Sequence, residues 1–105
     1  MIFNTENIIG ETLNLEEVGL KLHLTSSKSI KKWIVDNNVR IYLIGGRKNM
    51  IYRFDLEVAL LEPKALDLYF SNPKTWEFEV LPYCNYNQNY LHLLKKRIQK
   101  RLGLN

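Results

Sequence analysis

Residues 13–38 read LNLEEVGLKLHLTSSKSIKKWIVDNN, and this stretch decides the fold. Asn14 suits the N-cap of a first helix over residues 14–22, and Glu17 stands where its side chain can bond back to the cap. One face of that helix carries Leu15, Val18 and Leu22. Only His23-Leu24-Thr25 and a serine pair separate it from the next amphipathic segment. The stretch therefore predicts two short helices joined by a tight turn.

The second helix is expected over residues 27–36, with Ser26 or Ser27 as its cap. Its buried face is predicted to hold Ile30, Trp33 and Ile34. At about 100° per residue, the opposite face gathers Lys28, Lys31 and Lys32. Val35 also falls on the lysine side and breaks the clean pattern. Asn37-Asn38 ends the helix, because asparagine tolerates the left-handed backbone of a C-cap.

A β-hairpin follows this helix. Residues 40–44 are rich in strand-forming side chains, and Gly45-Gly46 supplies the positive φ angles of a turn. We expect residues 47–49 at the tip and residues 50–52 as the return strand, with Tyr42 and Tyr52 as a cross-strand pair. Asp55 then caps a third helix, which is predicted to end near Pro63.

The C-terminal part has a different pattern. Residues 75–81 alternate Trp76, Phe78 and Val80 with two glutamates, which predicts a half-buried strand. A last helix over residues 89–102 has a narrow apolar stripe of Leu91, Leu94, Ile98 and Leu102. We expect the stripe to pack on the strand or on the N-terminal core; a dimer interface stays open as an alternative. The predicted domains are residues 1–62 and an extension over residues 63–105.

Charge is segregated along the chain, although the net charge is only +4. Residues 1–20 hold four acids and no base, and residues 54–80 hold six acids and two bases. Residues 21–53 hold eight bases and one acid, and residues 81–105 hold five bases and no acid. Two basic blocks of this kind attract phosphate polyanions when they lie on a folded surface.

The order helix, tight turn, basic helix, glycine hairpin, helix is that of a winged helix-turn-helix. Leu13-Asn14-Leu15-Glu16-Glu17-Val18 resembles the opening L-T-x-E-E-A/V of the small MerR-like winged-helix family, which includes phage and transposon excisionases. Residues 24–34 are similar to its recognition segment. Ile44-Gly45-Gly46-Arg47, Ile51 and Asp55-Leu56-Glu57 resemble its I-G-G-R, I and D-L-E wing and closing helix. The likeness covers about residues 12–61.

The resemblance implies an α+β winged helix-turn-helix that binds double-stranded DNA without catalysis, here with a C-terminal strand and a basic amphipathic helix. The family's recognition positions carry over to Ser27, Lys28, Lys31 and Lys32, and its wing arginine to Arg47. Lys48 lies beside Arg47 in the hairpin, and the last helix adds Lys96, Arg97, Lys100 and Arg101 as a second phosphate-binding surface. The implied role is that of an excisionase-like architectural factor or a transcriptional regulator of a mobile element or prophage. A protein–protein adaptor on the same scaffold, without DNA binding, is the alternative.

Other function classes have weak support in the sequence. Cys84 is the single cysteine, and it forms no ligand pair with His23 or His92, so we expect neither a metal site nor a nucleophile. Gly45-Gly46 lacks the lysine and hydroxyl residue of a phosphate loop. No apolar run is long enough to span a membrane. We therefore expect a cytoplasmic DNA-binding protein with no cofactor, no small-molecule ligand and no enzymatic activity.

Overall fold

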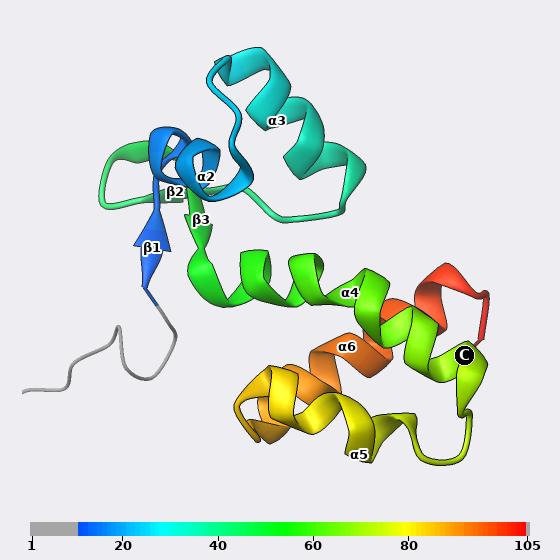
Figure 1. The fold of residues 1–105 in the computed structure, drawn as a ribbon. Helices are drawn as coiled ribbons and strands as arrows, with labels where there is room; N and C mark the ends of the chain where they lie inside the picture. Colours follow the sequence, from blue (N-terminus) through cyan, green and yellow to red (C-terminus); the bar gives the residue numbers. More distant parts are fainter. Residues whose placement is uncertain (1–10, 105) are drawn as a thin grey trace, which may run out of the picture. The chain divides into compact units, whose positions relative to one another are not determined.

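The computed structural model describes residues 11–104, and in them the predicted α+β class is confirmed. They form five α-helices, one short 3-10 helix and a three-stranded antiparallel sheet (Figure 1). The chain divides into two compact units, Met1–Glu57 and Val58–Asn105. The predicted first domain runs from residue 1 to residue 62, and its first ten residues lie outside the described part of the chain.

The two helices predicted in the first unit are present. Helix α2 spans Leu15–Leu22 and begins with the predicted capping box. The Glu17 amide donates to Asn14 Oδ1 at 2.8 Å, and the Asn14 amide donates to Glu17 Oε1 at 3.1 Å. His23 then adopts a left-handed backbone, with φ at 58°, and turns the chain. Helix α3 follows as Ser27–Asp36, with Ser26 as the cap that accepts from the Ser29 amide.

The sheet has the order β1-β3-β2 and holds one strand that the sequence did not reveal. Strand β1, Thr12–Leu13, pairs with the end of β3, Arg47–Tyr52, and β3 also pairs with β2, Tyr42–Ile44. The two-residue turn consists of Gly45 and Gly46, with φ angles of 57° and 80°. Positive φ at both positions is the geometry that suits the twist of a hairpin. Residues 47–49 therefore belong to strand β3, and their predicted position at the tip is wrong.

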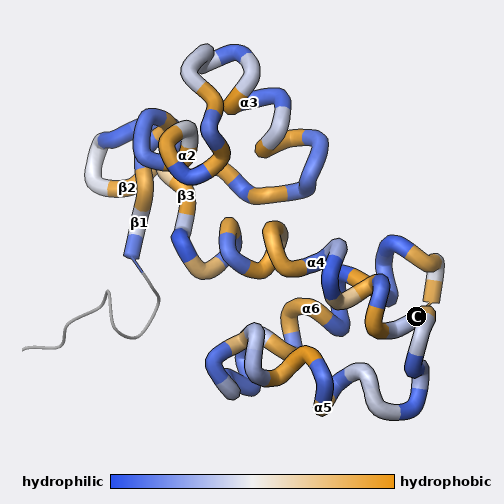
Figure 2. The backbone as a smooth tube through the Cα atoms, in the orientation of Figure 1, coloured by the Kyte–Doolittle hydropathy of each residue, from blue (hydrophilic) through white to orange (hydrophobic). Residues whose placement is uncertain are grey.

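The core of the first unit forms where the helices face the sheet. Fully or nearly buried side chains come from β1, the helices, the loop before β2, and β3: Leu13, Val18, Ile30, Ile34, Val39, Met50, Ile51 and Leu56. Trp33, which the periodicity assigned to the core, is half-buried. Figure 2 shows the resulting alternation of hydrophobic and hydrophilic segments along α3. One face of α3 is thus fixed against the protein and the other is left to solvent.

Helix α4 spans Arg53–Ser71, so the predicted end near Pro63 is wrong, and Asp55, predicted as the cap, lies inside the first turn. A proline inside a helix removes one backbone hydrogen bond and crowds the preceding turn. Pro63 is exposed, but its neighbours Glu62 and Ala65 are buried. Packing on both sides of the proline therefore holds the helix together where local propensity alone would end it.

The predicted strand over residues 75–81 is also wrong, since Trp76–Val80 forms helix α5 and Leu81–Cys84 a 3-10 turn, η1. Trp76 and Val80 are buried, whereas the Phe78 side chain is 76% exposed. Trp76 and Val80 are four residues apart, so they share one face of a helix as well as one face of a strand. The chain adopts the helix. Helix α6, Gln88–Arg101, contacts η1 and buries Leu91, Leu94 and Ile98 of the predicted stripe.

Candidate nucleic-acid interface

Helix α3 presents a cationic face to solvent. Ser27, Lys28, Lys31 and Lys32 are all exposed. On the opposite side of the helix, Ile30 and Ile34 are 2% and 0% exposed. The periodicity of the sequence requires this separation, because residues three and four apart share one face. The three lysines therefore lie together on one accessible face, and Ser27, three residues before Ile30, is exposed at the first turn of the helix.

The lysines of this face differ in their partners. Lys32 Nζ lies 2.6 Å from Asp36 Oδ2, one helical turn later, and both side chains are more than half exposed. An exposed pair of this kind contributes at most about 1 kcal/mol, so it leaves Lys32 free to exchange its partner. Within residues 11–104, no ion pair engages Lys28 or Lys31. Both amines are thus accessible to an anion.

The hairpin brings two further cations to its surface. Arg47 and Lys48 follow the Gly45-Gly46 turn directly, and both are exposed. The pairs Tyr42 with Met50 and Ile44 with Arg47 show that β3 holds one more residue than β2 over this stretch. Asn49, at φ 60°, lies in this bulge. Bulges strengthen the local twist and redirect neighbouring side chains, and this one lies beside the two cations.

The predicted tyrosine pair of the hairpin is confirmed. The rings of Tyr42 and Tyr52 lie edge to face with centroids 4.9 Å apart. The Arg40 guanidinium carbon lies 5.3 Å from the centroid of the Tyr42 ring. Arg40 is not among the residues that the sequence predicts to contact DNA. Its contact with Tyr42 was foreseeable, since Arg40 belongs to the basic block and residues two apart share a face of an extended segment.

The cations of α6 are not equivalent. Glu62 of helix α4 is only 5% exposed and accepts from Arg97 Nε at 2.8 Å and from Arg101 Nε at 2.7 Å. The prediction that all four cations of this helix point outward is therefore wrong for Arg97, whose side chain is 20% exposed. Arg101 is half-exposed but shares the same carboxylate. Lys96 and Lys100 are exposed.

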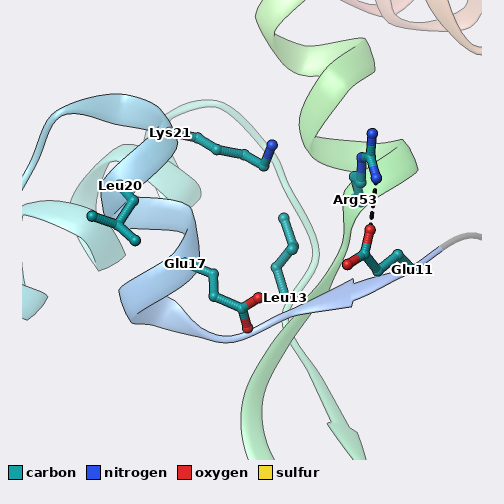
Figure 3. A pocket seen from close by; sticks show the side chains of 6 residues that line it. All are labelled: Glu11, Leu13, Glu17, Leu20, Lys21 and Arg53. Carbon is teal, nitrogen blue, oxygen red and sulfur yellow. Dashed lines mark hydrogen bonds and ion pairs between the residues drawn. The ribbon is translucent and has the colours of Figure 1, made fainter.

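A shallow pocket of about 380 Å³ lies in the first unit, between β1, α2 and the start of α4 (Figure 3). Three of its four charged groups, Glu11, Glu17 and Arg53, take part in hydrogen bonds or ion pairs, and the fourth is the exposed Lys21. Arg53 donates to Glu11 Oε2 and to Glu57 Oε1, both at 2.6 Å, and Glu17 belongs to the capping box. The hydrogen bond to Glu11, and then that to Glu57, raises the pKa of the Arg53 guanidinium. The ion pair between Arg53 and Glu11 thus joins the start of β1 to the first turn of α4.

Two further findings concern reactive groups and membranes. Cys84 is fully buried, and desolvation raises the pKa of its thiol, so the thiolate is disfavoured. Among residues 11–104, no three histidine, cysteine or acidic side chains gather into a metal-binding group. No described helix combines the length and the apolar character needed to cross a bilayer.

A scan against family models and searches of curated proteins and of solved structures found no match to this chain. The likeness of residues 12–61 to the MerR-like family stays a prediction from sequence. The case for an interface therefore rests on the chain's own residues and their geometry.

Proposed function

We propose that this protein binds double-stranded DNA as a winged helix-turn-helix, with α3 as the recognition helix and the β2–β3 hairpin as the wing. The observation that carries the proposal is the two-sided character of α3. Its apolar side is buried at Ile30 and Ile34, and its exposed side carries Lys28, Lys31 and Lys32. A recognition helix needs a fixed inner face and an outer face of long polar or cationic side chains.

The exposed groups match the chemistry of the major groove. Lysine amines donate to guanine O6 and N7 and to flanking phosphates, and a serine hydroxyl can donate or accept. Ser27 lies at the first turn of α3, where free backbone amides also favour phosphate. Arg47 and Lys48 are exposed just after the hairpin turn, and in this proposal they contact the sugar–phosphate backbone beside the groove.

We further propose that the DNA-bound role is that of an excisionase-like architectural factor or a transcriptional regulator of a mobile element or prophage. The support is the resemblance of residues 12–61. An architectural factor bends its site, so equal mobility of duplexes with the site at the centre and at the end would contradict that role.

The test begins with selection from random duplexes at two salt concentrations, using the full chain. The selected duplex is then titrated with the parent and with a variant that carries alanine at Lys28, Lys31 and Lys32. We expect the variant to lose the selected site and to remain folded, because exposed substitutions change the free energy of unfolding by no more than about 0.5 kcal/mol each.

A charge-matched control removes three exposed lysines elsewhere, namely Lys21, Lys64 and Lys74. It should keep the preference for the selected site. Equal loss in both variants would show that net charge, and not the α3 face, controls binding. A parent chain with no DNA affinity even at low salt would overturn the proposal and favour the adaptor function.

A further inference from the structure

Val35 is the one apolar residue on the cationic face of α3, and its side chain is 66% exposed. At 3.6 residues per turn, it lies about 20° around the helix from Lys28, about 40° from Lys31 and about 60° from Lys32. Valine thus stands within the lysine cluster, not at its margin. The other aliphatic side chains of α3, Ile30 and Ile34, are buried.

Neither the core nor the helix explains a valine at this position. An exposed side chain gains nothing from burial, and a β-branched residue has a lower helix propensity than the lysines around it. A role in contact with a partner explains it. That partner must offer an apolar group within a surface that also accepts hydrogen bonds from three lysine amines.

The base edges of the DNA major groove meet both conditions. Acceptors are plentiful there on guanine and thymine, and the thymine C5-methyl is the apolar group. An apolar protein surface would instead bury lysine amines without partners, which is costly. The charge on this face therefore favours DNA over a protein as the occupant.

We infer that Val35 contacts a thymine C5-methyl and makes α3 selective for thymine at one position of the site. This inference rests on the proposed function and adds a specificity-determining residue to it. Val35 lies seven residues after Lys28, which is about 10 Å along the helix. If α3 runs along the groove, the thymine lies about three base pairs from the pair that Lys28 contacts, at about 3.4 Å for each pair.

The experiment replaces each thymine of the selected duplex, one at a time, with deoxyuridine, which lacks only the methyl group. The parent and the Val35→Ala variant are titrated with every duplex. We expect one replacement to weaken parent binding about four-fold, the value of one buried methyl or methylene group. The same replacement should leave Val35→Ala binding unchanged, because the variant no longer reaches the methyl.

Leu20→Ala is the matched control, since Leu20 of the adjacent helix is equally apolar and 73% exposed. This variant should still bind about four-fold more weakly when deoxyuridine replaces the contacted thymine. A parent that is indifferent to every replacement, or a Val35→Ala variant that keeps the full effect, overturns the inference while DNA binding by the parent stands. Absence of DNA binding by the parent overturns the proposed function itself, so the two failures are distinguishable.

Discussion

Gly19 of α2 lies so close to Ile30 of α3 that a Cβ atom on the glycine would be 2.6 Å from Ile30 Cδ1. The same Cβ would be 2.6 Å from the carbonyl oxygen of Leu24, in the turn between the two helices. Carbon atoms in contact normally lie at 3.5–4.0 Å. The absence of a side chain at Gly19 therefore sets how closely α2 and α3 approach, and with it the outward direction of the lysine face.

Gly19→Ala should lower the free energy of unfolding by about 1–3 kcal/mol, the usual cost of overpacking. The gain in helix propensity, about 1 kcal/mol, offsets only part of it, because the backbone oxygen of Leu24 cannot move as a side chain can. Denaturant unfolding measures the difference. Leu20→Ala is the control at the next, exposed position and should change stability by less than about 0.5 kcal/mol. Equal stability of Gly19→Ala and the parent would contradict the close packing.

Removal of both wing cations, Arg47→Ala with Lys48→Ala, should weaken binding to all DNA sequences to a similar extent. Each lost phosphate contact lowers the salt slope by about 0.9, so we expect a fall of roughly 2 in the plot of log affinity against log salt concentration. Titrations at several salt concentrations give the slope. An unchanged slope with loss of one base preference would mean that the wing reads bases.

Glu62→Gln should destabilise the second unit by about 1–3 kcal/mol. The neutral amide removes the carboxylate charge that Arg97 and Arg101 share, although the cost stays below that of a fully buried pair because Arg101 is half-exposed. Glu77→Gln is the control, since Glu77 forms a half-exposed pair with Lys95 at 3.1 Å. Its effect should be below about 1 kcal/mol. Thermal or denaturant unfolding compares the two; equal effects would mean that Glu62 has no special structural role.

The substitutions Phe78→Ser and Trp76→Ala distinguish helix α5 from the strand that the sequence predicts for the same residues. In helix α5 the Phe78 side chain is 76% exposed and Trp76 is 5% exposed. Phe78→Ser should therefore change stability by less than about 0.5 kcal/mol, and Trp76→Ala should cost about 3–5 kcal/mol. A strand would place both rings on one buried face, and both substitutions would then be costly. Denaturant midpoints decide between the two outcomes.

Cys84 should make stability depend on pH in the alkaline range. Burial raises the pKa of its thiol above the ordinary 9.0, so the unfolded chain releases the proton first as the pH rises. The resulting loss of stability begins near pH 9.0 and approaches about 1.4 kcal/mol per pH unit until the folded thiol also ionises. The Cys84→Ala variant lacks this contribution. The difference in unfolding free energy between the parent and this variant should shrink above pH 9.0, and a constant difference would contradict it.

Local signals predicted the first unit well. The Asn14–Glu17 capping box depends on residues three apart, and the faces of α3 follow from helical spacing, so both are visible in the sequence. The tyrosine pair followed from the hairpin turn. Strand β1 has two residues and exists only through its pairing with β3, 38 residues later at the Leu13–Ile51 pair, so no local pattern indicates it.

In the second unit, local sequence patterns did not correctly predict the end of α4 or the secondary structure of α5. An alternating pattern of only five residues is compatible with a strand and also with about one and a half turns of helix. The burial of Trp76 and Val80 by tertiary packing favours the helix. Pro63 stays in its helix for a similar reason. For the candidate site, the sequence marked Arg97 and Arg101 as free cations, because their partner Glu62 lies 35 and 39 residues away.

The asparagines with left-handed backbones have a consequence for how this sequence can change. The chain has 11 asparagines, an abundance that resembles the base composition of an AT-rich gene. Yet Asn38, Asn49 and Asn85, at φ 56°, 60° and 51°, each stand where the chain reverses or bulges. Most other side chains lose roughly 1–2 kcal/mol in this conformation. If the base composition of the gene changes and these asparagines are replaced, glycine is the residue that preserves the path of the chain at these three positions.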